Sequence, residues 1–178
     1  LNIYDNNVEG ISRKKYSFTS KNKGQITHIE DFLNPKKDSL FYSRYDIIIH
    51  AAAITPKFAK SKSDYKKNIL ISKFFLEKLS LFKGQFIHLS SASVYEPSRH
   101  PLNEKSSLTT KDEYGISMYE SEDIFKKKIS NILILRIFFD LDPSKNFSAL
   151  LTASIILVYE SSELSANVNI PCLNKINP

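Results

Sequence analysis

The segment YDIIIHAAA, residues 45–53, is a continuous apolar run that ends in three alanines. Runs of this kind, without alternating polar residues, are typical of strands that are buried on both faces of a parallel sheet. Two further runs, GQFIHLSSASVY (84–95) and NILILRIFF (131–139), follow at intervals long enough to contain a helix. We therefore expect three adjacent buried strands of one parallel sheet, at residues 45–50, 85–90 and 131–137.

Helical patterns lie between these runs. From Ser63 to Leu81, apolar residues recur at helical spacing with lysines opposite them, which predicts an amphipathic helix on the sheet. A second helix is expected from about Tyr114 to Ile129, and a short one within 34–43. Strands that alternate with helices indicate right-handed βαβ units and a doubly wound, Rossmann-like α/β fold.

The two ends of the chain give weaker patterns. LNIYD (1–5) and QITHIED (25–31) predict short strands, and the polar stretch 6–24 between them predicts a loop with at most a weak helix. We expect a helix within 147–159 and no regular element after it.

The composition is that of an ordinary globular protein, with 42% hydrophobic and 25% charged residues among 178. No apolar segment is long enough to predict a transmembrane helix, and the first residues do not resemble a signal peptide, so we expect a cytoplasmic protein without a membrane partner. One cysteine, Cys172, excludes an internal disulfide and a cysteine-cluster metal site, and we expect no metal. The net charge of +6 comes mainly from dispersed lysines, which favours a solvated surface over nucleic-acid binding.

Candidate site residues follow the strands, because ligands of open α/β sheets bind at the carboxyl ends of the strands. Asp5 could accept hydrogen bonds from a ribose, or it could simply form a turn. The alanines of 51–53 could let a flat cofactor lie close to the backbone, or they could serve tight packing of strand against helix. His50, inside an apolar strand, is more often a core histidine than a base.

Ser91 and Tyr114 could converge as a general acid–base pair, in which the serine polarises an oxygen and the tyrosine exchanges its proton. The plainer alternative is a capping serine and a half-buried tyrosine at a helix start. A free tyrosine titrates near pH 10, so it needs a cation one helical turn away to act near neutrality. That position holds Met118.

Six features occur in one order with suitable spacings: YDIIIHAAA, Asn68, FIHLSSASVYE, PLNE (101–104), YGISMYESE and ILRIFF. Together they resemble the extended short-chain dehydrogenase/reductases, the NAD-dependent epimerase/dehydratase group that acts on nucleotide sugars. LNIYDNN also looks like the second strand of that family. The resemblance covers about residues 1–140 and implies a partial NAD-binding domain there, with 141–178 as a remnant or irregular segment.

The resemblance also implies roles for single residues. Asp5 would bind the adenosine ribose and favour NAD over NADP, while Asp31 and Phe32 would flank the adenine. Ser91 and Tyr114 would be the catalytic serine and the tyrosine of the Tyr-x-x-x-Lys motif, with a nucleotide sugar as substrate. The remaining implied cofactor residues are Ala51, Ala52, Ala53 and, beneath the cofactor, Asn68.

The chain departs from that family in three ways. It has no glycine-rich phosphate loop, Met118 stands at the lysine position, and few residues remain for a substrate domain. We therefore expect a truncated, catalytically impaired relative whose NAD binding is weak or lost. A non-catalytic remnant or binding module of the same fold is the alternative. The missing first strand would leave a sheet edge or slot open to another chain, including a second copy.

Overall fold

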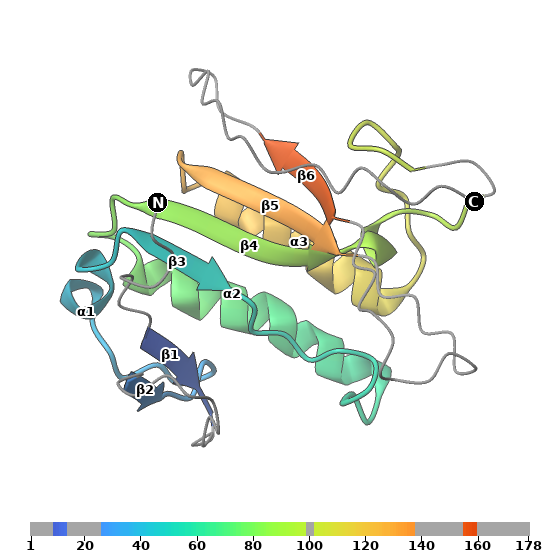
Figure 1. The fold of residues 1–178 in the computed structure, drawn as a ribbon. Helices are drawn as coiled ribbons and strands as arrows, with labels where there is room; N and C mark the ends of the chain where they lie inside the picture. Colours follow the sequence, from blue (N-terminus) through green and yellow to red (C-terminus); the bar gives the residue numbers. More distant parts are fainter. Residues whose placement is uncertain (1–8, 14–25, 99–101, 138–154, 160–178) are drawn as a thin grey trace, which may run out of the picture.

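A computed structural model describes residues 9–13, 26–98, 102–137 and 155–159 (Figure 1). The described elements, in chain order, are β1 (Glu9–Ser12), β2 (Ile26–Ile29), α1 (Ser39–Ser43), β3 (Ile47–His50), η1 (Lys62–Tyr65), α2 (Lys66–Lys78), β4 (Gln85–Ser91), η2 (Ala92–Val94), α3 (Glu113–Lys126), β5 (Ile132–Ile137) and β6 (Ile155–Tyr159). The helices among them are too short to cross a lipid bilayer.

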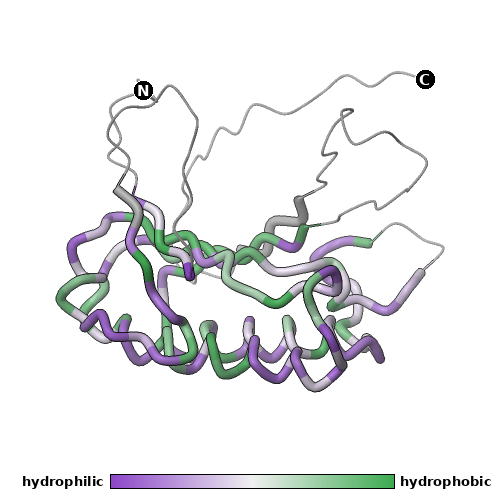
Figure 2. Tube along the Cα trace, turned by 90° about the horizontal axis from the view of Figure 1, so that it is seen from below, coloured by the Kyte–Doolittle hydropathy of each residue, from purple (hydrophilic) through white to green (hydrophobic). Residues whose placement is uncertain are grey.

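The main sheet has the strand order β3-β4-β5-β6, and its first three strands are parallel. Ile47 aligns with Gln85, and Phe86 aligns with Ile132. Helices α2 and α3 contact each other and lie along one side of this sheet (Figures 1 and 2). The three predicted strands are therefore confirmed as adjacent and parallel, within a partial Rossmann-like α/β fold.

The prediction that β3 is buried on both faces is wrong. His50 is buried, but Ile47 and Ile49 are 56% and 62% exposed. On the neighbouring strands, Phe86 and Ile134 face the helices and are fully buried, because α2 and α3 cover that face. In the part of the chain that the structure describes, no helix covers the opposite face of β3.

Residues 155–159 form a strand, although we expected a helix within 147–159. Strand β6 pairs antiparallel with β5, with Leu133 opposite Tyr159. The sequence IILVY is rich in β-branched residues, which suit a strand, and a short apolar run does not by itself separate strand from helix. Residues 147–154 and the segment after 159 lie outside the described residues.

Strands β1 and β2 form a separate two-stranded parallel sheet instead of joining the main one. Strand β2 was predicted, but β1 lies in the stretch that we expected to be a loop. Pairing with β2 satisfies the backbone hydrogen-bonding groups of Glu9–Ser12. The polar sequence of this stretch did not by itself predict a strand. The strand expected at 1–5 lies outside the described residues.

The core lies between the main sheet and its two long helices. An aromatic cluster dominates it, because large rings bury the most apolar area for each residue. Phe86 and Phe125 have ring centroids 4.8 Å apart and no exposed surface. Tyr42 and Phe75 continue the cluster towards α1 with an edge-to-face contact at 5.2 Å.

Candidate active site

Ser91 ends β4, and Tyr114 lies in the first turn of α3. Asp112 caps this helix by accepting a hydrogen bond from the Gly115 amide at 2.9 Å. A Cβ atom at Gly115 would lie 2.0 Å from the Ser93 carbonyl oxygen, so only glycine lets the helix start approach the loop after β4 this closely. As a result, the Ser91 hydroxyl lies near enough to the Tyr114 phenol to lower its pKa, while Ser91 Oγ itself donates a hydrogen bond to Ser93 Oγ at 3.2 Å. The structure thus brings these two predicted residues together.

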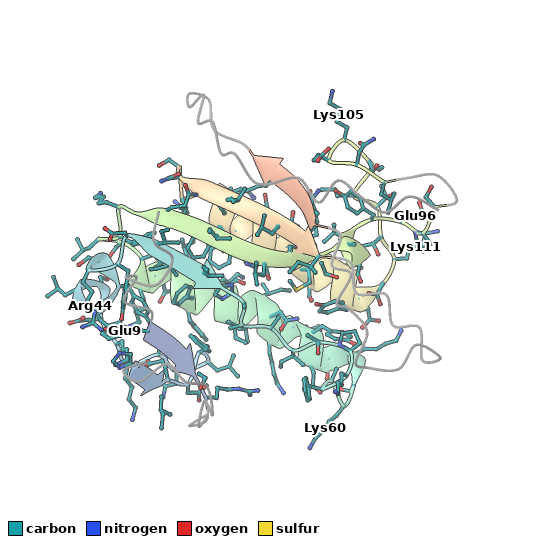
Figure 3. The ribbon with its side chains drawn as sticks, in the orientation of Figure 1. Glu9, Arg44, Lys60, Glu96, Lys105 and Lys111 are labelled. Atoms are coloured by element: carbon teal, nitrogen blue, oxygen red, sulfur yellow. The ribbon has the colours of Figure 1, made fainter. Side chains whose placement is uncertain are left out.

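The surroundings of Tyr114 favour its protonated form. Burial raises the pKa of the phenol, the nearby Ser91 hydroxyl opposes that rise, and the neighbouring Tyr65 and Asp112 raise the pKa further. None of these neighbours is a cation. Met118, one turn along α3, is 2% exposed and lies in the hydrophobic core. Lys111 could in principle replace the missing lysine, but it is exposed in the loop before α3 (Figure 3).

A cavity of about 650 Å³ lies between β1 and β3. Five of the residues predicted to bind a cofactor line it together: Asp31, Phe32, Ala51, Ala52 and Ala53. The alanines leave the space open, while the Asp31 carboxylate also accepts a hydrogen bond from the Leu33 amide at 3.0 Å. Asp5 lies outside the described residues. Ser91 and Tyr114 do not line this cavity.

Asn68 is buried and ties three segments together. Its side-chain oxygen accepts a hydrogen bond from the Ile54 amide at 2.7 Å, and its amide nitrogen donates to the Ile54 carbonyl and to Ser117 Oγ, each at 3.2 Å. These bonds hold the loop after the alanines against α2 and α3. Asn68 does not line the cavity itself.

Two cations along the cavity were not predicted. Arg13 follows β1 and Lys67 lies on α2, and both contribute to the wall that also contains the alanines. Lys67 forms an ion pair with Asp64 at 2.5 Å. Neither residue stands out in the sequence, because the chain carries 25 lysines and arginines that are spread along its length.

A buried ion pair between α3 and β5 was also missed by the sequence analysis. Arg136 on β5 donates to both carboxylate oxygens of Glu122 on α3, at 2.9 and 2.6 Å, and to the Tyr95 hydroxyl at 2.7 Å. Ser90, next to Ser91, donates to the same carboxylate at 2.6 Å. The network connects α3 with β4 and β5. An arginine inside the apolar run ILRIFF was the available signal.

A comparison with protein families matches residues 2–138 to the NAD dependent epimerase/dehydratase family. The chain belongs to this family. A search of curated proteins finds no match.

Solved structures of similar fold include the UDP-glucuronic acid 4-epimerase from Bacillus cereus in complex with NAD, with 24% identity and a TM-score of 0.58. The alignment covers 72% of this chain and 47% of that one. The same enzyme with UDP-glucuronic acid and NAD aligns at 26% identity and a TM-score of 0.56, over 65% and 40% of the two chains. The UDP-Glc/GlcNAc 4-epimerase from Campylobacter jejuni aligns at 19% identity and 0.55, over 70% and 42%. The chain therefore spans less than half the length of these structures.

Proposed function

We propose that this chain is a nucleotide-sugar epimerase/dehydratase-like protein whose cavity binds the adenosine part of NAD and whose hydride chemistry is impaired. The observation that carries the proposal is Tyr114. Tyr114 has a serine neighbour, as acid–base chemistry needs. At the position where a cation is needed, however, the chain has Met118, whose side chain is packed in the hydrophobic core. The nucleotide-sugar substrate is inferred from the family and from the ligands named for the similar epimerases.

The residues along the cavity suit one half of the cofactor better than the other. Small side chains at Ala51–Ala53 leave room for a flat group close to the backbone. The described glycines serve other purposes: Gly10 lies in β1, Gly84 lies against the Asp46 carbonyl and Gly115 against that of Ser93. In the described ranges no glycine-rich turn is left to hold a pyrophosphate, so Arg13 and Lys67 are the groups that could contact an anion there.

When bound, NAD would supply the hydride acceptor, and side chains of the protein would remove the proton from the substrate. Ser91 would orient the reacting hydroxyl by a hydrogen bond, and Tyr114 would take its proton. A tyrosine whose pKa is raised above 10 by burial is a poor base near neutral pH, and Met118 cannot stabilise its anion. This arrangement favours binding without turnover, which is the second candidate function: a binding module of the same fold.

Calorimetric titration with NAD tests the binding half of the proposal. We expect a dissociation constant near or above 1 mM, a binding free energy of only about 4 kcal/mol, because each missing charge-assisted hydrogen bond to the pyrophosphate costs roughly 1.5–3 kcal/mol. Ala52→Phe, which fills the cavity, should abolish the residual binding, while Leu40→Ala on α1 should leave it unchanged. Tight binding by the unaltered chain would contradict the proposal.

Restoring the cation tests the catalytic half. Met118→Lys should lower the pKa of Tyr114, because an ammonium beside the phenol stabilises the phenolate. NMR of tyrosines labelled at the phenol carbon measures this pKa, and Met118→Leu is the matched control. Turnover of UDP-sugars with NAD should be undetectable in the unaltered chain. Ready turnover there would show that Tyr114 works without the lysine.

A further inference from the structure

An arginine stands directly after β1, at the cavity that was proposed for the adenosine. Strand β1 ends at Ser12, Arg13 follows it, and both residues line the cavity together with Ala51–Ala53. Figure 1 shows β1 and β3 running in the same direction, so their carboxyl ends point the same way. Nucleotides bind α/β sheets at the carboxyl ends of the strands. Arg13 therefore lies where a bound nucleotide would meet β1.

Arg13 is on the side of the cavity that was predicted to hold the adenine. Strand β2 pairs with β1, and the Glu30 amide after β2 donates a hydrogen bond to the Ser12 carbonyl at 3.0 Å. Asp31 and Phe32, which were expected to flank the adenine, come next in the chain and line the same cavity. In a dinucleotide the ribose is bonded directly to the adenine, whereas the pyrophosphate lies beyond the ribose. A cation on this side of the cavity is thus placed for substituents of the ribose.

The charge of Arg13 is not neutralised within the part of the chain that the structure describes. The residue is exposed and has no ion pair or hydrogen bond with the described side chains. Lys67, the other cation along the cavity, is already paired with Asp64 at 2.5 Å. A guanidinium has two parallel N–H donors that match the oxygens of a phosphate. Of the two cations, Arg13 is therefore the one available to an anionic ligand.

The two described carboxylates along the cavity have other partners. Glu9, at the amino end of β1, accepts hydrogen bonds from Arg44 Nη2 at 2.6 Å and from the Tyr45 hydroxyl at 2.5 Å (Figure 3). Asp31 accepts a hydrogen bond from a backbone amide two residues further on, at 3.0 Å. Arg13 is thus left to balance the charge of a ligand.

We propose that the cavity prefers an adenosine that carries a 2′-phosphate, so that the cofactor is NADP rather than NAD, and that Arg13 binds this phosphate. The inference rests on the proposed function, because it takes the adenosine half of a nicotinamide dinucleotide as the ligand. An acid near this strand end would accept hydrogen bonds from free ribose hydroxyls, whereas an arginine accommodates a 2′-phosphate. Asp5, the acid that the resemblance assigned to the ribose, precedes β1 in the chain, and Arg13 follows it. The preference would set this chain apart from a family that is named for NAD.

Calorimetric titration of the chain with three small ligands tests the proposal: adenosine 5′-monophosphate, adenosine 2′,5′-bisphosphate and adenosine 3′,5′-bisphosphate. The 2′,5′-bisphosphate should bind roughly tenfold or more tightly than the monophosphate, because it adds charge-assisted hydrogen bonds. The 3′,5′-bisphosphate carries the same charge on the neighbouring hydroxyl and should gain much less. NADP should show the same advantage over NAD.

Substitutions at Arg13 assign the preference to this residue. Arg13→Ala should remove the advantage of the 2′-phosphate and leave the affinity for the monophosphate unchanged, whereas Arg13→Lys should retain part of the advantage. Lys105→Ala is the matched control, because it removes the same charge from an exposed residue that does not line the cavity (Figure 3). It should keep the full preference. Circular dichroism checks that the variants are folded.

Equal affinity for the monophosphate and the 2′,5′-bisphosphate would overturn the inference and leave the proposed adenosine site standing. Tighter binding of the monophosphate would overturn it as well and would favour the ribose role of Asp5. An equal gain from the 3′,5′-bisphosphate, or a preference that survives Arg13→Ala, would remove the assignment of the 2′-phosphate to Arg13. If none of the three ligands binds, the inference and the proposed function fail together.

Discussion

At β5, the guanidinium of Arg136 is enclosed between Glu122 and Tyr95, whereas at β3 the side chains of Ile47 and Ile49 lie largely in the open. One side of the sheet buries a charged residue, and the other side exposes apolar ones. The difference arises because helix α3 covers β4 and β5, whereas the outer edge of β3 faces a cavity. Stability should therefore depend strongly on the α3–β5 side, and binding on the β3 edge.

The largest expected effect is at the buried ion pair. Glu122→Ala should lower the free energy of unfolding by about 3–5 kcal/mol, because it leaves the Arg136 charge buried without a partner. Urea unfolding measures the change. The double variant Glu122→Leu/Arg136→Met should regain most of the loss, since an apolar pair needs no charge partner. A loss below about 1 kcal/mol would place this pair with ordinary surface salt bridges.

Acid should act on the boundary between the two regions, where His50 on β3 and His88 on β4 lie with their Nδ1 atoms 3.1 Å apart. Burial lowers the pKa of His88 to about 4, and burial and His88 lower that of His50 well below 6.5. Each histidine takes up its proton more readily in the unfolded chain, so its contribution is intact above pH 6.5 and falls as the pH drops towards 4.

Between pH 7 and pH 5, we expect the free energy of unfolding to fall by about 2 kcal/mol for His88, with His50 acting in the same direction. Urea unfolding at both pH values measures the fall, and His88→Leu should reduce it. If the unaltered chain is equally stable at pH 7 and pH 5, the two histidines are not buried in their neutral forms.

Substitutions of two glycines test whether the close approach of α3 to the loop after β4 affects the pKa of Tyr114, with Gly84 as the control site. Gly115→Ala and Gly84→Ala would each place a Cβ atom against a carbonyl oxygen, at 2.0 Å from Ser93 and 2.1 Å from Asp46. Each should cost about 1–3 kcal/mol through forced backbone shifts. Only Gly115→Ala should also raise the pKa of Tyr114, because it pushes α3 away from Ser91. NMR of labelled tyrosines would detect this, and an equal rise in both variants would argue against a local cause.

The smallest effect is expected at the β1 edge. Glu9→Gln should leave the unfolding curve unchanged within error, because Arg44 is half exposed and a glutamine oxygen can still accept its hydrogen bonds. The same urea experiment measures it, with Glu122→Gln as the buried counterpart that should destabilise. A clear loss for Glu9→Gln would mean that the β1 edge is more firmly fixed than its contacts indicate.

The sequence by itself determined the strands β3, β4 and β5, their order and the position of the Ser91–Tyr114 pair. Continuous apolar runs and helical spacing are local signals, and strand ends in a parallel sheet meet at one edge, so residues that follow strands converge. The same logic singled out Asp31 and the alanines as candidates, the family resemblance added Phe32, and the structure places all of them along one cavity.

Only the tertiary structure decided which faces are covered and which polar groups meet. An apolar run reads alike whether one or both of its faces are buried, so the exposure of Ile47 and Ile49 was not visible in the sequence. IILVY became a strand because the edge of β5 offered it a partner. The Glu122–Arg136 pair and the placement of Arg13 and Lys67 along the cavity join residues far apart in the chain. Their meeting depends on how helices and strands are arranged in space, which no local periodicity records.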